Sequence, residues 1–172
     1  MERQPELPTN RRLTQDGRGD RVFDLLKLML VLLRREFEVN VSLTVAWHHL
    51  AQVEQWPTWA KHIKHVELQP KGELTPNTVG RFRLTNGVKS VFKMTEINPS
   101  RNWKWAGPFL WLVVHYDHQF EKIEAGRTKL TWLVSADGFG VSILGRLFAA
   151  IYNNNLDKAI PRLIGEMNAL QE

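Results

Sequence analysis

The 172-residue chain contains no cysteine, and this absence removes several kinds of chemistry at once. Disulfide frameworks, thiolate nucleophiles and zinc sites built on thiolates are all excluded, while a reducing compartment is permitted but not required. The chain also lacks an uninterrupted apolar run close to the roughly 20 residues that a membrane-spanning helix needs. We therefore expect a cytoplasmic protein without a membrane span.

A strong excess of charge of either sign is also missing. The chain has 23 Lys and Arg residues against 18 Asp and Glu residues, a net charge of +5. Residues 1–35 hold eight of the basic and five of the acidic residues, so most of the excess lies there. No basic patch alternates with stacking aromatic residues, and we therefore predict no nucleic-acid partner. The length suits one domain with a sizeable core.

The N-terminal residues divide into two parts. Residues 1–20 are rich in Pro, Gly, Gln, Asn and charge, which predicts a flexible tail. The apolar spacing over residues 21–33 predicts an additional helix, placed at 21–35. This helix would pack on the domain, form a dimer contact, or make a peripheral membrane contact through residues 21–33, because its apolar arc is wide and its flanks are basic. The sequence leaves the oligomeric state open.

The rest of the chain alternates in the manner of antiparallel strands. Residues 36–41 predict a first strand, and Ser42 can cap a helix that runs to about residue 53. Pro57 is expected to begin a second short helix that ends near His62. Further strands are predicted at 63–69, 80–85, 88–97, 102–106, 111–121 and 129–136, with a hairpin turn at Asn86-Gly87.

A long amphipathic helix is predicted over residues 141–170. Its expected inner arc comprises Leu144, Phe148, Ile151, Tyr152, Asn155, Ala159, Leu163 and Leu170. The elements together predict an α+β protein. A curved antiparallel sheet of six to seven strands would wrap around the long C-terminal helix, with two short helices after the first strand. The ligand-binding domain would span residues 36–172, with an apolar hollow between sheet and helix.

Several short motifs occur in an order that is similar to one known superfamily. They are Val45-Ala46-Trp47 followed by Trp56-Pro57-Thr58-Trp59, His118-Gln119-Phe120 before Gly126-Arg127-Thr128, and Gly138 before the long helix. In this order the chain resembles the START-like (SRPBCC) superfamily, specifically its polyketide cyclase/dehydrase and lipid-transport group, over about residues 36–170. The resemblance implies a helix-grip fold, in which the sheet wraps around the long helix, and a cavity for a hydrophobic small molecule.

One position departs from the pattern of that group. Many relatives carry an acidic residue at the inward position of the last strand, where this chain has Val134. The neighbouring inward position holds Trp132 rather than a polar side chain. Both differences imply a drier cavity and disfavour acid–base chemistry.

His118 is the one histidine that the alternation places on the apolar inner face, between Tyr116 and Phe120. A neutral imidazole there can donate or accept a hydrogen bond to a ligand carbonyl or hydroxyl group. The alternative is a core histidine satisfied by the backbone or by Tyr116. As a general base His118 lacks a carboxylate partner, because Asp117 faces the opposite side of the strand.

The six histidines do not predict a metal site. His115 and His118 point to opposite faces of one strand, and the adjacent His48 and His49 diverge by about 100° on a helix. No carboxylate stands at a convincing spacing for a third ligand. We therefore predict no metal, no cofactor and no catalytic residue.

The leading hypothesis is a protein that binds a lipid, isoprenoid or polyketide-like molecule in a cavity between sheet and helix. One alternative is a metal-free enzyme of the polyketide cyclase/dehydrase kind that uses His118 and Tyr116 as polarising groups. Another is a membrane-associated protein that presents a lipid or quinone. Binding without catalysis is favoured, although the question stays open. The expected lining consists of Phe82, Leu84, Phe92, Met94, Trp103, Trp105, Val114, Tyr116, His118, Phe120, Leu130, Trp132, Val134, Phe148, Ile151, Tyr152 and Asn155.

Overall fold

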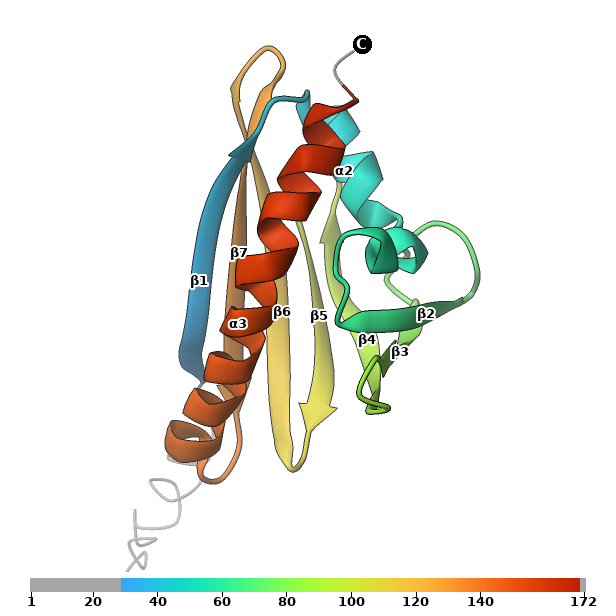
Figure 1. Cartoon of the computed structure of the whole chain (residues 1–172). Helices are drawn as coiled ribbons and strands as arrows, with labels where there is room; N and C mark the ends of the chain where they lie inside the picture. The colour runs from blue at the N-terminus through green and yellow to red at the C-terminus, as the bar shows by residue number, and fades with distance from the viewer. Residues whose placement is uncertain (1–28, 171–172) are drawn as a thin grey trace, which may run out of the picture.

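The computed structural model describes residues 29–170 and contains one sheet with helices on one side of it (Figure 1). The strands and helices follow one another along the chain as β1 (Leu30–Val39), α2 (Leu43–Ala51), the 3-10 helix η1 (Val53–Thr58), β2 (Ile63–Gln69), β3 (Val79–Leu84), β4 (Lys89–Asn98), β5 (Asn102–Phe109), β6 (Leu112–Glu124), β7 (Arg127–Asp137) and α3 (Val141–Asn168).

The sheet contains seven antiparallel strands in the order β1-β7-β6-β5-β4-β3-β2. Each strand from β2 to β7 pairs with its neighbour in sequence, and β1 closes the order by pairing with β7. The long helix α3 runs across one face, with α2 and η1 beside its C-terminal half (Figure 1). Thr58, at the end of η1, donates a hydrogen bond to Glu166 of α3 at 2.9 Å. The predicted α+β helix-grip fold is confirmed.

The core fills the space between the sheet and α3. On β6 the inner face carries Leu112, Val114, His118 and Phe120, all buried, as the alternation predicts. On β7 the inner positions are Leu130, Trp132, Val134 and Ala136, which are also buried. The helix α3 contributes Leu156, Ala159, Ile160, Leu163 and Met167 to the same core. Period-two alternation therefore identified the buried face of both central strands.

The expected helix over residues 21–35 is wrong in its last six residues. Residues 30–35 belong to β1, which pairs with β7, and residues 21–28 lie outside the described part of the chain. The register shifts between Val31 and Leu33, so a β-bulge interrupts the alternation there, and both Leu32 and Leu33 pack on the core. Residues 30–33 therefore begin an edge strand of the sheet and are not part of an amphipathic helix.

Two other helix boundaries differ from the prediction. The second short helix begins before Pro57 rather than at it, since η1 spans Val53–Thr58 and contains Pro57. On α3, Ile151 is 56% exposed and Leu170 follows the end of the helix, so neither belongs to the inner arc. Leu156 and Ile160 occupy that arc instead, since the buried stripe of a 28-residue helix drifts around its axis.

Ser42 caps α2 as the sequence predicts. Its backbone is extended, and its hydroxyl accepts a hydrogen bond from the backbone N–H of Val45 at 3.3 Å. We expect Ser42→Ala to lower the free energy of unfolding by about 1 kcal/mol, because one N–H at the helix start loses its partner. Urea denaturation of both proteins measures the difference. Ser42→Asp is the control and is expected to retain most of the stability, and an unchanged value for Ser42→Ala would contradict the role of the cap.

The hairpin predicted at Asn86-Gly87 joins β3 to β4. Gly87 has a φ of +87°, a left-handed conformation that favours glycine, and the Leu84 N–H donates a hydrogen bond to the Val88 carbonyl at 2.8 Å.

Among the helices of the described residues, none is both long and apolar enough to span a bilayer.

Candidate ligand-binding site

His118 lies at the centre of a cluster of aromatic rings. Its ring centroid is 5.0 Å from that of Trp105, 5.4 Å from Trp132, 5.6 Å from Trp103 and 5.7 Å from Trp56. Trp103 and Trp105 come from β5, Trp132 from β7, and Trp56 from η1. The register places Trp103 and Trp132 directly opposite His118 on its two neighbouring strands. Three adjacent strands and η1 therefore enclose one imidazole.

Three buried nitrogen atoms in this cluster have no hydrogen-bond partner among the described residues. They are His118 Nδ1, Trp103 Nε1 and Trp132 Nε1. Trp56 differs, because its Nε1–H donates to the Leu50 carbonyl at 2.8 Å. A buried polar group without a partner costs about 1–3 kcal/mol, so three such atoms around one ring require a physical explanation.

Burial fixes the charge of His118. The side chain is 3% exposed, and removal from water lowers its pKa to about 3. The ring is therefore neutral at pH 7 and carries one donor nitrogen and one acceptor nitrogen. The site offers hydrogen-bonding edges without a net charge, which suits a neutral ligand group such as a carbonyl or hydroxyl.

Two tyrosines extend the cluster towards the N-terminal half of α3. Tyr116 and Tyr152 meet edge to face with centroids 5.7 Å apart, and the Tyr152 ring stacks on Phe148 at 5.5 Å. Trp105 contacts both Tyr116, at 6.0 Å, and His118. Burial raises the pKa of both phenols well above the usual value, so both stay protonated at pH 7.

The structure brings most of the predicted lining residues together. The group around His118 contains Trp103, Trp105, Phe120 and Trp132, and Phe82 and Phe92 join it through ring contacts with Trp105.

A second group, beside α3, contains Val114, Tyr116, Val134, Phe148 and Tyr152. Met94 and Leu130 are fully buried in the core, while Leu84 and Asn155 are half-buried. Ile151 is the exception, because it points to solvent.

The prediction missed residues that close the cluster from outside the central strands. Trp56 contacts His118, Trp59 contacts Trp132 at 6.0 Å, and Phe37 of β1 meets Trp132 edge to face at 5.1 Å. The sequence alone favours core packing for Trp56 and Trp59. The two residues are three positions apart, which places both rings on one side of a helical turn. This spacing could have predicted that both rings contact the cluster.

A surface hollow of about 440 Å³ approaches the cluster from the side of α2 and η1. Its lining includes Trp47, Gln52, Leu68 and Leu74. The ring of Trp47 also contacts Trp103 at 4.8 Å and Phe120 at 5.1 Å. One aromatic ring therefore separates this hollow from the rings around His118.

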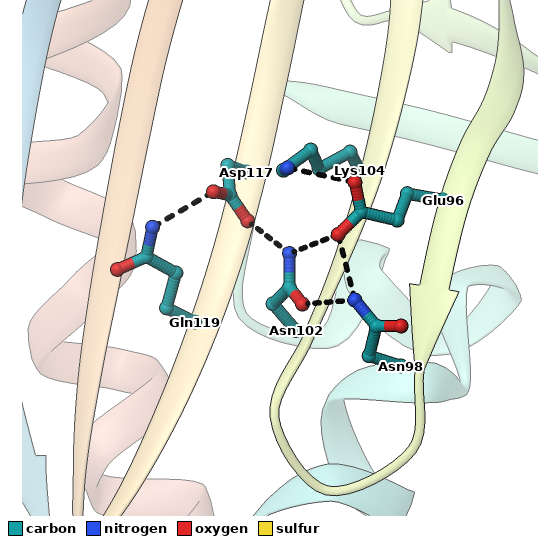
Figure 2. A network of polar contacts seen from close by, with 6 residues as sticks. All are labelled: Glu96, Asn98, Asn102, Lys104, Asp117 and Gln119. Atoms are coloured by element: carbon teal, nitrogen blue, oxygen red, sulfur yellow. Dashed lines mark hydrogen bonds and ion pairs between the residues drawn. The ribbon is translucent and has the colours of Figure 1, made fainter.

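The opposite face of the sheet carries a polar network that the sequence reasoning did not identify (Figure 2). Glu96 accepts hydrogen bonds from Lys104 at 2.8 Å, from Asn98 at 2.7 Å and from Asn102 at 3.1 Å. Asn102 also donates to Asp117 at 3.0 Å. The hydrogen bond from Lys104 lowers the pKa of the Glu96 carboxyl.

The network lies in an open groove of about 530 Å³. Its groups bond one another across β4, β5 and β6, so the arrangement stabilises the pairing of these strands. Within residues 29–170 there is also no grouping of three or more histidine or acidic side chains that would hold a metal ion.

The comparison with known families gives one match that covers most of the chain. Residues 31–163 match the family described as polyketide cyclase/dehydrase and lipid transport. The chain belongs to this family. A comparison with curated proteins finds no match. In this member of the polyketide cyclase/dehydrase and lipid-transport family, the inward positions of β7 are occupied by Trp132 and Val134, which are both buried among apolar side chains.

Several solved structures share the fold of this chain at low sequence identity. The Zhui aromatase/cyclase from Streptomyces has a TM-score of 0.62 and 15% identity over 81% of this chain and 94% of its own. A START superfamily protein from Mycobacterium smegmatis has a TM-score of 0.63 and 15% identity, covering 83% and 99% of the two chains. Ara h 8.0201 has a TM-score of 0.66 and 15% identity, covering 82% and 99%. These similarities establish the START-like fold of the family member described here.

Proposed function

We propose that the protein binds a hydrophobic small molecule, such as a lipid, isoprenoid or polyketide-like ring system, between the sheet and α3. The polar end of the ligand lies at His118, and its apolar body lies among the surrounding aromatic rings. The observation that carries this proposal is the group of three unpaired nitrogen atoms at the centre of an otherwise apolar core. A ligand oxygen can accept from an indole N–H and bond the imidazole, which removes part of the cost of burying them.

The ligand chemistry follows from the charge of the site. His118 is neutral, both tyrosines are protonated, and the inward positions of β7 are apolar. A charged ligand head would lose its hydration without gaining an ionic partner, which costs several kcal/mol. A carbonyl, hydroxyl or quinone oxygen avoids this cost and still meets the donors. The proposal therefore favours neutral oxygenated ligands over free fatty acids.

The hollow beside α2 suggests the route into the core. Trp47 forms part of its lining and contacts Trp103 and Phe120, so rotation of this one ring would join the hollow to the cluster. Ligand binding would then require movement of aromatic side chains, because the rings around His118 contact one another. This requirement suits a flat or flexible apolar ligand.

We expect His118→Phe to weaken binding of an oxygenated ligand by about 1–3 kcal/mol. Phenylalanine retains the ring but removes the hydrogen-bonding edge, so the ligand oxygen loses a partner. A plain hydrocarbon probe of similar size is expected to bind equally well or better. Isothermal titration with a matched pair of ligands, one carrying a ketone and the other the corresponding alkane, measures both effects.

Tyr152→Phe provides the matched control for this substitution. It removes a hydroxyl from the neighbouring group of rings, beyond direct contact with His118, and is expected to leave the ketone preference intact. Equal response of the ketone and the alkane to His118→Phe would show that His118 is a packing residue, and the proposed polar anchor would be lost.

The second candidate function is catalysis of ring closure in a polyketide-like substrate. The observation that favours it is the placement of half-buried Tyr116 and buried His118 on the same face of β6, both uncharged. Each can donate a hydrogen bond to a substrate carbonyl and increase its polarisation. An enzyme of this kind would lose roughly 10²–10⁴-fold in turnover on His118→Phe while binding is largely retained. A binding protein would show no turnover with any substrate tested.

Native mass spectrometry of freshly purified protein tests the proposal directly. We expect a co-purifying molecule with a mass in the range of lipids or isoprenoids, which is released by organic solvent. Trp103→Phe combined with Trp132→Phe removes two of the unpaired donors and is expected to reduce occupancy. A ligand bound with equal occupancy in this double variant would contradict the assigned position of its polar end.

A further inference from the structure

The outer face of α3 is apolar in its first three turns and polar afterwards. Ile143, Leu147 and Ile151 recur every four residues and are 79%, 57% and 56% exposed. Further along the same face stand Asn154, Lys158 and Arg162, which are also exposed. The inner face of the first three turns is apolar as well, with Val141, Leu144 and Phe148 packed on the core. A helix that is apolar on both faces is normally covered on both.

The exposed stripe continues onto two loops at the same end of the molecule. Phe139, between β7 and α3, is 79% exposed, and Trp111, between β5 and β6, is 60% exposed. The Trp111 Nε1–H donates to the Phe139 carbonyl at 2.8 Å, which holds the two loops together. We call Trp111, Phe139, Ile143, Leu147 and Ile151 the apolar stripe. Monomeric proteins seldom leave a patch of this kind uncovered unless it has a function.

The start of β1 packs on the buried side of the same turns of α3. At the start of β1, Leu30 pairs with Ala136 of β7, three residues before Phe139. A methyl group added at Gly145 would lie 2.7 Å from Leu32 Cδ2, so β1 packs closely on the first turns of α3. Figure 1 shows that β1 begins at the end of the molecule where α3 also begins. The start of β1 therefore lies at the end of the molecule that also carries the apolar stripe.

The sequence of that preceding segment matches the stripe in size and chemistry. Residues 21–28 include Val22, Leu25 and Leu26 at a helical spacing, and eight helical residues extend about 12 Å. The distance from Ile143 to Ile151 along α3 is also about 12 Å. Arg146 is the one charged residue between Gly138 and Leu156, and the segment carries Arg21, Asp24 and Lys27 outside its apolar positions.

We propose that residues 21–28 pack on the apolar stripe of their own chain and cover the outer face of α3. Attachment to β1 keeps the segment at a high local concentration, so modest apolar contact is sufficient to hold it. This contact is separate from the ligand site, because the stripe lies on the side of α3 that faces away from the sheet. A second copy of the chain and a lipid surface are the competing occupants of the stripe.

A disulfide between engineered cysteines tests the contact, and the natural absence of cysteine makes each pair unique. Leu25→Cys combined with Leu147→Cys, in the full chain, is expected to form an intramolecular disulfide under mild oxidation. Lys27→Cys combined with Leu147→Cys is the matched control, because position 27 has nearly the same tether but points about 200° away on a helix. We expect the first pair to close at least tenfold faster than the control.

Three results would overturn the proposal. Equal closure rates for the two pairs would mean that the segment is merely tethered near the stripe. Disulfides that form between two chains at micromolar protein concentration would assign the stripe to a second copy. Cosedimentation of the unmodified protein with phosphatidylcholine–phosphatidylglycerol vesicles, abolished by Ile143→Asp with Leu147→Asp, would assign it to a lipid surface.

A single cysteine gives an independent measurement that does not depend on cross-linking geometry. With Leu147→Cys alone, the thiol is expected to react slowly with maleimide in the full chain. Adding Leu25→Asp and Leu26→Asp should increase this rate at least tenfold, because the segment can no longer pack. Arg162→Cys, further along α3 on its polar face, is expected to react at the same rate in both backgrounds. If the maleimide reaction rate of Leu147→Cys is the same with and without the two aspartates, the segment does not cover the stripe.

Discussion

Replacement of Trp132 by alanine is expected to lower the free energy of unfolding by about 3–5 kcal/mol. The side chain is 4% exposed and contacts Phe37 of β1, Trp59 of the segment after η1, and His118 of β6. Its removal leaves a cavity among rings that belong to three separate parts of the chain, and their rigid attachment prevents collapse into the space. Thermal and urea denaturation measure the loss.

Trp132→Phe is the informative companion to this substitution. Phenylalanine retains most of the contacts and removes an indole N–H that has no partner in the described residues. The lost packing lowers the free energy of unfolding, while removal of the unpaired indole N–H raises it. We therefore expect a net decrease of about 1 kcal/mol or less. If Trp132→Ala itself costs less than about 1 kcal/mol, the residue borders an existing cavity rather than filling the core.

Acid is expected to destabilise the protein through His118. Burial lowers its pKa in the folded state to about 3, while the unfolded chain has the ordinary value of 6.5. Between these two values the unfolded state binds the proton more readily, so stability is fully present above pH 6.5 and falls as the pH decreases towards 3. The slope contributed by this residue approaches 1.4 kcal/mol for each pH unit.

His118→Phe isolates this contribution. Burial also lowers the pKa values of His49 and His62, so the variant is expected to retain a shallower dependence of the same sign. Urea denaturation of both proteins between pH 7 and pH 4 gives the difference in slope. Identical pH profiles for the two proteins would mean that burial does not lower the pKa of His118 in the folded state.

The sequence predicted the central strands well because one simple pattern dominates there. On β6 and β7 the inward positions are mostly apolar and the outward positions are mostly polar, so alternate residues differ sharply in polarity. This alternation is sufficient to assign His118, Trp132 and Val134 to the inner face, and all three are buried there. The same reasoning gave Ser42 as a helix cap, because the hydroxyl acts on its immediate neighbours. Features that depend on neighbouring residues could therefore be predicted from the sequence.

Features that depend on distant parts of the chain could not be predicted from the sequence. A β-bulge allows both Leu32 and Leu33 to pack on the core, and the resulting apolar run has the spacing of a helix. Trp56 reaches His118 across 62 positions, which no local pattern encodes. The network around Glu96 joins three strands through polar residues that each look like ordinary solvent-facing positions.

The pairing of β1 with β7 has a consequence for the nascent protein. During synthesis β1 emerges before the other strands of the sheet. Its partner β7 is made about 100 residues later, since Leu30 pairs with Ala136 and Val39 pairs with Thr128. At roughly 5–20 residues per second, the ribosome leaves this leucine-rich strand unpaired for some 5–20 s. Closing so long a loop is also slow. The interval makes the first strand a natural client for a chaperone that binds short apolar segments at the ribosome exit.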